Sequence, residues 1–237
     1  GRTSDTFIYN MTAAPWWNNW EATRYSNMED MAVEGMNSGM AQTYYPSFTN
    51  YVEGIYVGYK YYETADDDGK IDYDATVQYP FGYGLSYTTF TQEMSNLTVK
   101  DGEITFDVTV TNTGDVAGKD VVEIYYNPPY TNGGIEKATA NLIDFEKTQM
   151  LEPGASETIT ITFDAEDMAS YDMSGDGCYV LEQGDYAISV NSDSHTVLDQ
   201  QIYTQDETVR YEGDNKRESD QIAATNQFED VAGGVTY

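Results

Sequence analysis

The sequence predicts a mainly β protein, in which an antiparallel β-sandwich of the immunoglobulin or fibronectin III type follows an irregular, aromatic-rich segment. The first observation is the stretch "EITFDVTVTN", where apolar and polar residues alternate from Ile104 to Thr111 with the period of two that marks a half-buried strand. The second is the recurrence of such short runs, separated by turn residues and with little helical pattern between them. The third is the first 91 residues, which are rich in rings but lack this alternation.

About seven strands are expected in the sandwich region. The alternating stretch is followed by the turn "TGDVAG" and then by "KDVVEIYY", in which Val122, Ile124 and Tyr126 share one face. Later strands follow the turns "EPG" and "EQGD". The predicted strands are residues 97–99, "EITFDVTVTN", "KDVVEIYY", residues 142–147, "ETITITF", "YAISV" and a last strand near residues 195–203.

Residues 1–91 differ from the sandwich region in composition and pattern. Half of the 22 tyrosines lie between Tyr44 and Tyr87, and three tryptophans lie in "PWWNNW". Only residues 27–36 hold a pattern compatible with a short helix. Because such a segment buries its rings poorly by itself, we expect it to pack against a partner surface.

The charge balance restricts the possible partners. The chain has 41 acidic and 11 basic side chains, a formal net charge of −30. This charge repels nucleic-acid phosphates and anionic lipids. No apolar run approaches the roughly 20 residues that span a bilayer, so membrane insertion is not expected. Cys178 is the only cysteine, which excludes an internal disulfide and leaves the compartment open among extracellular, cell-surface and cytoplasmic.

Several motifs resemble glycoside hydrolase family 3. "YVEGIYVGYKYYETA" and "YPFGYGLSYTTF" resemble the end of the α/β sandwich domain of that family, and "VTVTNTGDVAGKDVVEIYY" resembles the fibronectin type III-like domain that follows it. The opening "GRTSDTF" resembles a segment that closes the α/β core, and its lack of an initiator Met suggests an excised piece. The tail "NKRESDQIAATNQFEDVAGGVTY" resembles the connection to the catalytic barrel in members with inverted domain order. The resemblance implies an α/β segment at 1–91, a sandwich at 92–202 and a linker or arm at 203–237.

The resemblance also implies what the chain lacks and with what it works. Retaining glycosidases use two carboxylates, and the family places its Asp nucleophile on the barrel and its acid/base Glu upstream of these motifs. We therefore assign no catalytic residue and no cofactor. The expected role is an accessory part of a β-glucosidase-type enzyme, whose other domains and oligosaccharide substrate are the partners. The alternatives are a sandwich module that binds carbohydrate or a surface protein, and a proteolytic remnant.

Five aromatic residues are the candidate sugar contacts. An indole face can stack on a pyranose, which favours Trp16, Trp17 and Trp20, with Asn18 and Asn19 beside them as hydrogen-bonding partners. Burial against absent parts of the α/β core is the favoured interpretation, because the whole segment is rich in aromatic residues. Tyr44 and Tyr45 are weaker candidates of the same kind.

Two acidic stretches invite a calcium interpretation. "TADDDGKIDYDA" contains Asp66 and Asp68, and "DMSGDG" contains Asp172 and Asp176. Neither places an acidic ligand at the twelfth position of an EF-hand loop. Solvated turns are therefore the favoured interpretation, and no metal is assigned.

The remaining polar candidates are expected to be structural. Glu53 and Glu63 flank packed rings, where a glutamate is more often a hydrogen-bonded structural residue than an acid or base. His195 is the only histidine and is expected at an exposed strand edge without a triad. Cys178 is expected to pack inside the sandwich.

Overall fold

The computed structural model describes residues 1–19, 23–49, 51–174 and 177–220. They form two compact units. The first unit combines Gly1–Asn10 with Ile55–Glu218, and the second combines Met11–Gly54 with the chain from Ser219 onward. The aromatic-rich segment is thus shared between both units, while the expected boundaries at residues 91 and 202 stay predictions. Within the described ranges, no helix is long and apolar enough to cross a bilayer.

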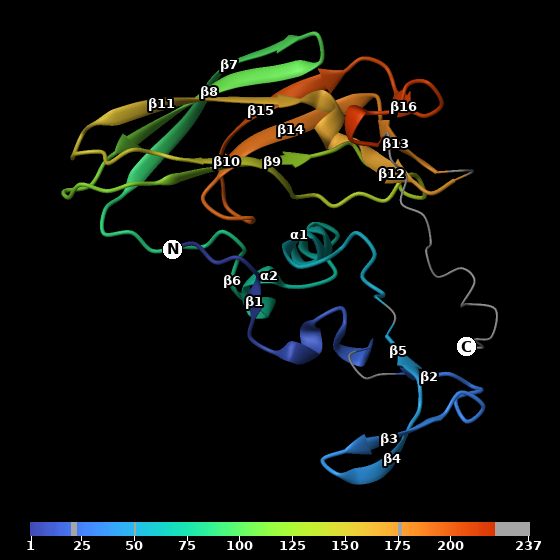
Figure 1. Ribbon diagram of the computed structural model, residues 1–237. Coiled ribbons are helices and arrows are strands. Elements are labelled where there is room, and N and C mark those ends of the chain that lie inside the picture. Colours follow the sequence, from blue (N-terminus) through green and yellow to red (C-terminus); the bar gives the residue numbers. More distant parts are fainter. Residues whose placement is uncertain (20–22, 50, 175–176, 221–237) are drawn as a thin grey trace. The chain divides into compact units, whose positions relative to one another are not determined.

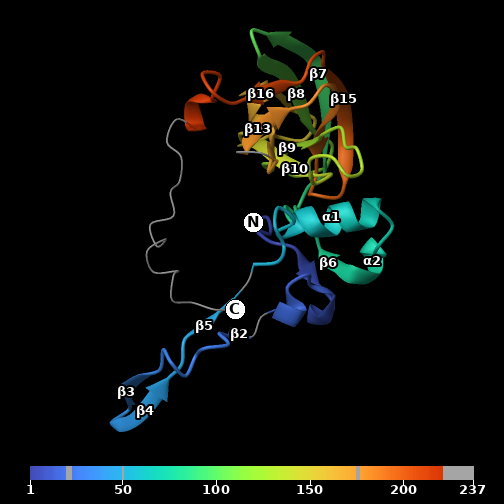
Figure 2. The same cartoon turned by 90° about the vertical axis from the view of Figure 1, so that its right-hand side faces the viewer.

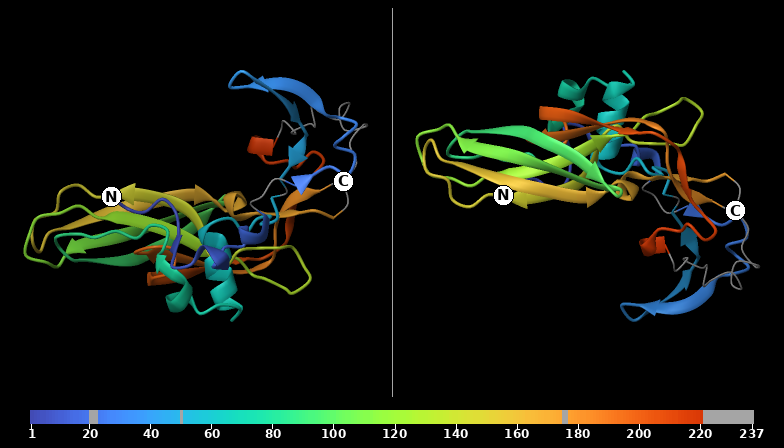
Figure 3. Two further views of the ribbon diagram at one scale, coloured as in Figure 1. Left: turned by 90° about the horizontal axis from the view of Figure 1, so that it is seen from below. Right: turned by 90° about the horizontal axis from the view of Figure 1, so that it is seen from above.

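The first unit contains the β-sandwich, which confirms the predicted fold class (Figure 1). One sheet has the strand order β10-β9-β14-β15 and the other the order β11-β8-β7, with antiparallel pairing throughout. The long strands of both sheets run along a common direction in the views from below and above (Figure 3). The strands are β7 (Phe90–Lys100), β8 (Glu103–Asn112), β9 (Val121–Asn127), β10 (Asn141–Lys147), β11 (Ser156–Asp164), β14 (Gly184–Asn191) and β15 (Val197–Gln205).

The core between the sheets follows from the alternation in the strands. Val108 of β8, Ile124 of β9 and Ile188 of β14 are fully buried and belong to one apolar cluster. Each such side chain contributes about 1.5–3 kcal/mol through removal of its apolar surface from water. The inward-facing residues of the alternating strands therefore supply most of the energy that holds the two sheets together.

The outward face of β8 carries polar side chains that pair with the neighbouring strand. Successive hydroxyls on β8 lie opposite hydroxyls on β11, as the register of the two strands requires. We call this row the hydroxyl ladder. Its pairs are Thr105–Thr162 at 3.1 Å, Thr109–Thr158 at 3.1 Å and Thr111–Ser156 at 2.8 Å.

Strand β7 is longer than predicted, and its turn explains the register with β8. The two-residue loop Asp101-Gly102 has positive φ at both positions, 53° and 87°, as a type I′ hairpin turn requires. Asn96 also has a positive φ, and the register shifts between Ser95 and Thr98. This bulge interrupts the alternation of β7, so the pattern revealed only its second half.

A smaller sheet, in the order β12-β13-β16, lies at one end of the sandwich. Cys178 belongs to this sheet, outside the apolar cluster of the two main sheets, and its Sγ lies 3.1 Å from Nη2 of Arg210. Cys178 is buried as expected, with 7% exposure, but it packs in this smaller sheet and not between the two main sheets. The elements are the 3-10 helix η3 (Ala165–Met168) and the strands β12 (Ser170–Asp172), β13 (Cys178–Leu181) and β16 (Val209–Tyr211).

The first unit also contains a small helical body beneath the sandwich (Figure 2). This α1 body consists of β1 (Phe7–Ile8), α1 (Tyr59–Asp67), α2 (Tyr73–Thr76) and β6 (Val77–Tyr79), in which β1 pairs with β6. Tyr62, Tyr73 and Val77 form its buried centre. Its core is too small to be stable alone, so it depends on the sandwich.

The end of helix α1 explains the first acidic stretch. The N–H of Gly69 (φ 66°) donates to the carbonyl of Asp66 at 2.8 Å, and the N–H of Lys70 donates to that of Ala65 at 2.8 Å. These two bonds form a Schellman cap, which needs a glycine where the backbone turns left-handed. Half of the stretch read as a turn is therefore helix.

The second unit holds short elements and one hairpin. The predicted helix at 27–36 is wrong, because β3 pairs with β4 through residues 33–37 instead. The tight turn Ser38-Gly39, with φ of 51° and 85°, suits a two-residue hairpin loop. The elements are η1 (Met11–Ala13), η2 (Trp17–Asn19), β2 (Thr23–Arg24), β3 (Val33–Asn37), β4 (Met40–Tyr44) and β5 (Ser47–Phe48), and the 3-10 helix η4 (Glu218–Asp220) follows the first unit.

Candidate functional site

The α1 body is fastened to the four-stranded sheet by side chains of Arg2, Tyr59 and Glu63. We call these three residues and their sandwich partners the joint. The hydroxyl of Tyr59 accepts a hydrogen bond from the backbone N–H of Leu142 in β10 at 2.9 Å. The Tyr59 ring stacks on Phe81 at 4.8 Å and meets the edge of Tyr125 at 6.0 Å. The tyrosine thus supplies both apolar contact and a hydrogen-bonding end.

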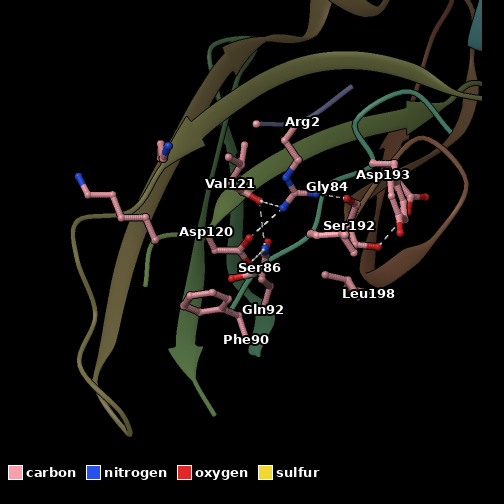
Figure 4. Close-up of a pocket in the computed structure, with 15 residues that line it drawn as sticks. Arg2, Gly84, Ser86, Phe90, Gln92, Asp120, Val121, Ser192, Asp193 and Leu198 are labelled. Carbon is pink, nitrogen blue, oxygen red and sulfur yellow. Dashed lines mark hydrogen bonds and ion pairs between the residues drawn. The ribbon is translucent and has the colours of Figure 1, made fainter. Parts of the chain in front are cut away.

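Arg2 points into a pocket of about 370 Å³ between the N-terminal segment and the sandwich (Figure 4). Its guanidinium donates to the carbonyl oxygens of Gly82, at 3.0 Å, and of Ser192. It also donates to Oδ1 of Asp120 at 2.8 Å, while Gln92 holds the other carboxylate oxygen at 2.8 Å. Because these partners occupy the guanidinium, Arg2 is a clasp between segments and is not available to an anionic ligand.

Glu123 is the buried charge of the joint. The residues on either side of it in β9 face the core, so Glu123 lies on the face that the α1 body covers, and only 4% of it is exposed. The Tyr125 hydroxyl donates to its Oε2 at 3.0 Å, and Nη1 of Arg2 lies 3.8 Å from its Oε1. Burial raises the pKa of Glu123 to about 7, although Arg2 and the Tyr125 hydrogen bond oppose the shift.

Gly82 passes against Glu123 where no larger residue fits. Its φ is 81°, and a Cβ at this position would lie 2.2 Å from Oε2 of Glu123. Two features therefore require a glycine at this position: the positive φ, and the close approach of its backbone to the Glu123 carboxylate. This places the "YPFGYGLSY" motif directly on β9.

Glu63 of helix α1 is the second carboxylate of the joint. It is 7% exposed, and its Oε1 accepts hydrogen bonds from the hydroxyls of Tyr73, at 2.6 Å, and Ser194, at 2.7 Å. Its Oε2 lies 2.7 Å from Nδ1 of His195. Three partners thus satisfy a carboxylate that would be costly to bury alone. Two of the three come from the connection between β14 and β15, so Glu63 links α1 to the sandwich.

His195 does not lie at a strand edge as predicted. It belongs to the turn before β15, where Asp193 accepts the backbone N–H of His195 at 3.1 Å. The imidazole stacks on the Tyr73 ring with centroids 3.6 Å apart, and its hydrogen bond to Glu63 raises the His195 pKa above the ordinary value. The predicted exposure is confirmed, because the side chain is 37% exposed.

The joint has the groups of a catalytic site but not its arrangement. Ser194 donates to Glu63 and not to His195, so these three residues do not have the order of a Ser-His-Asp triad. Glu63 has both oxygens occupied, and Glu123 is bonded to Tyr125. Among the described residues, no group of three or more potential ligands could hold a metal ion. The hydrogen bonds of the joint instead hold the α1 body against the sandwich.

The predicted sugar contacts lie in the second unit. Trp16 is 36% exposed and precedes η2, and Trp17 begins η2 and is half-buried. Trp20 lies outside the described residues. Tyr44 packs across Gly35, where a Cβ would lie 2.8 Å from its ring, and Tyr45 lies 5.4 Å beneath the guanidinium of Arg24.

The acidic stretches have specific structural partners. Asp66 accepts the backbone N–H of Tyr73 at 3.2 Å, and Asp68 pairs with Lys70 at 2.5 Å. Asp172 accepts the N–H of Ser174 and pairs with Arg210, and these contacts lower its pKa to about 2. Asp176 lies outside the described residues.

Sequence reasoning missed Arg2, Glu123 and Ser194 as parts of the joint. One signal was available: Glu123 interrupts the apolar run of "KDVVEIYY", and a charge inside a buried strand indicates a covering partner. No local signal connects Glu63 with His195.

Comparisons with known proteins agree with this architecture. Residues 120–194 match the model of the fibronectin type III-like domain. β-Glucosidase A of Butyrivibrio fibrisolvens is 40% identical over 158 residues, which are 59% of this chain and 18% of that protein. The structure of the Kluyveromyces marxianus β-glucosidase in complex with glucose superimposes with a TM-score of 0.69 and 28% identity, and covers 89% of this chain and 22% of that one. The GH3 β-glucosidase of Bifidobacterium adolescentis has a TM-score of 0.64 and 27% identity, and covers 87% of this chain and 26% of that one. These similarities support the interpretation of this chain as a fragment of a glycoside hydrolase family 3 protein.

The chain spans about a fifth of the length of the curated relatives that it matches. The fibronectin type III-like match includes Asp120, Glu123 and Ser194, the sandwich side of the joint. The motifs on the other side, around Glu63 and Gly82, are those that resembled the α/β domain. The joint therefore connects two regions that the sequence had distinguished.

Proposed function

We propose that this chain is the accessory, structural part of a family 3 β-glucosidase, and that it braces the domains that carry the catalytic carboxylates. Retaining glycosidases hold two carboxylates about 5–5.5 Å apart. When the two come from different domains, a displacement of about 1 Å lowers the rate strongly. A brace thus affects hydrolysis without touching the scissile bond.

The observation that carries this proposal is the joint. Arg2, Tyr59 and Glu63 each bond to sandwich residues, and the two buried carboxylates serve attachment. In the proposed enzyme, the remaining domains contact the α1 body, the arm at 203–237 leads toward the catalytic barrel, and the substrate is a β-linked oligosaccharide.

A chimaeric enzyme tests the brace. We expect the 237-residue chain alone to release no glucose from cellobiose. Butyrivibrio fibrisolvens β-glucosidase A, with its corresponding region replaced by this chain, should hydrolyse cellobiose. Arg2→Ala in that chimaera should lower kcat by roughly 10-fold with a smaller change in KM, because the displacement affects orientation more than binding.

Lys100→Ala, which removes an exposed cation at the β7–β8 turn, is the matched control and should leave kcat unchanged. Hydrolysis by the chain alone would contradict the proposal. An Arg2→Ala chimaera with the kcat of its parent would contradict it equally.

We further propose that Trp16, Trp17, Trp20, Tyr44 and Tyr45 contribute to an outer sugar subsite of the whole enzyme. The exposed part of Trp16 supports this, because an aromatic face open to solvent can stack on a pyranose. In the chimaera, Trp16→Ala should raise KM for cellotriose more than KM for cellobiose. Equal changes for the two substrates would contradict the assignment.

A further inference from the structure

Besides the pocket around Arg2, the first unit contains a pocket between helix α1 and the connection from β9 to β10. Its volume is about 470 Å³, within the range of roughly 300–1,000 Å³ that small-molecule sites occupy. Tyr61, Thr64, Ala65 and Asp68 line one wall with the spacing of a single helix face. The opposite wall comes from the β9–β10 connection and includes Tyr130.

Three tyrosines contribute to the lining of this pocket, which we call the tyrosine pocket: Tyr56, Tyr61 and Tyr130. Tyr56 and Tyr61 are half-buried, whereas Tyr130 is 49% exposed and stands at the rim. The Tyr56 hydroxyl donates to Oε2 of Glu136 at 2.5 Å, which fixes the ring in place. Burial and Glu136 raise the pKa of Tyr56, so this hydroxyl stays protonated and the bond persists.

Polar groups surround the rings and keep capacity for a ligand. Asp67, Asp68 and Glu136 offer carboxylate oxygens, and each carboxylate has about four acceptor sites, of which Tyr56 uses one on Glu136. Lys70 offers ammonium donors beside Asp68. Lys137 is already committed to the Pro129 carbonyl and to Glu182.

These charges select the class of ligand. Three carboxylates disfavour an anion such as a phosphate or an acidic sugar, and the Lys70 ammonium, which pairs with Asp68, offsets one of the three negative charges. Aromatic faces combined with hydrogen-bonding groups of both kinds suit a neutral molecule with an apolar face and many hydroxyls. We propose that the tyrosine pocket binds a neutral saccharide unit. This site uses residues of α1 and the β9–β10 connection and none of the candidate contacts around Trp16.

Calorimetric titration of the full 237-residue chain with cellobiose and xylobiose tests this site. We expect saturable binding of at least one disaccharide, with a Kd on the order of 1 mM. Tyr130→Ala should weaken binding about 3- to 10-fold, because it removes one stacking face. Tyr130 is exposed, so its loss should leave the thermal midpoint unchanged. Tyr87→Ala removes a fully exposed tyrosine outside the pocket and should leave the Kd unchanged.

Three results would overturn the site. The first is the absence of disaccharide binding at concentrations tenfold above the expected Kd. The second is binding that Trp16→Ala weakens and Tyr130→Ala does not, which would place the sugar in the second unit. The third is binding of spermidine without binding of disaccharides, which would indicate a cation site. None of these results affects the brace, which is tested by kcat in the chimaera.

Discussion

Glu123→Gln should remove a large part of the pH dependence of unfolding of this chain. The glutamine keeps the shape of the side chain and can accept the hydrogen bond from Tyr125, but it cannot ionise. Glu123 has a pKa of about 7 in the folded protein, compared with 4.5 for the free side chain. The folded state thus holds the proton more tightly than the unfolded state, which favours folding at low pH.

The expected size follows from this difference. The contribution of the Glu123 proton to the free energy of unfolding is fully present below about pH 4.5 and falls as the pH rises through 7. The difference between the folded and unfolded pKa values corresponds to about 3 kcal/mol. At pH 5 the variant and the parent should have similar free energies of unfolding. At pH 8 the variant should be more stable by about 1–2 kcal/mol, because the loss of the weak Arg2 attraction offsets part of the gain.

Urea denaturation followed by far-UV circular dichroism, which reports the strands of the first unit, measures both free energies at pH 5 and pH 8. Glu93→Gln, an exposed glutamate on β7, is the matched control and should reproduce the pH dependence of the parent. If the free-energy difference between Glu123→Gln and the parent is the same at both pH values, the assignment of a raised pKa to a buried Glu123 is wrong.

Three further changes probe the joint. Arg2→Ala should lower the free energy of unfolding, measured by urea denaturation, by about 2–3 kcal/mol, because it leaves the Asp120 carboxylate and two carbonyl oxygens without their donor. Arg2→Lys should recover less than half of this loss, since an ammonium cannot reproduce the forked geometry of the guanidinium donors. A loss below about 0.5 kcal/mol for Arg2→Ala would contradict the role of Arg2 as a clasp. Gly82→Ala should lower the free energy of unfolding by at least about 2 kcal/mol. Gly102→Ala is the control, since Gly102 has a similar φ but open space at the Cβ position, and it should lower the free energy of unfolding by about 1 kcal/mol. Equal losses for the two variants would show that the close approach of Gly82 to Glu123 does not matter. His195→Phe keeps the ring stack on Tyr73 and removes the hydrogen bond to Glu63. Because the pKa of His195 is raised in the folded protein, the stabilisation by the charged imidazole is present below about pH 6.5 and is lost at higher pH. The thermal midpoint of His195→Phe should therefore fall more at pH 5.5 than at pH 9, where only the neutral hydrogen bond to Glu63 is lost, and a larger fall at pH 9 would reverse the sign.

The sandwich was predictable because its signal is local. In β8, each residue reveals its face through its neighbours two positions away, and Ile104, Phe106, Val108 and Val110 are all buried as the alternation predicts. The bulge at Asn96 hid half of β7, because one extra residue moves the apolar positions to the other face.

The joint was not predictable, because its partners are distant in the sequence. Glu63 and His195 are 132 positions apart, and Arg2 and Asp120 are 118 apart. Helix α1 escaped notice because its buried face is built from tyrosine and glutamate, which a hydropathy pattern does not count as apolar. The resemblance indicated that the tyrosine-rich stretch is a seam, but the contacts that form it depend on the fold.

The hydroxyl ladder makes the sandwich asymmetric in what it can offer to other molecules. On the sheet that carries the hydroxyl ladder, threonine and serine hydroxyls form hydrogen bonds with one another. This face is therefore polar, and covering it with another molecule would gain little from the hydrophobic effect. Part of the outer face of the opposite sheet, around Glu123 and Tyr125 of β9, is already covered, because both side chains are buried. A spectroscopic probe or an affinity tag attached along β8 or β11 would therefore report on the protein while leaving its working surfaces undisturbed.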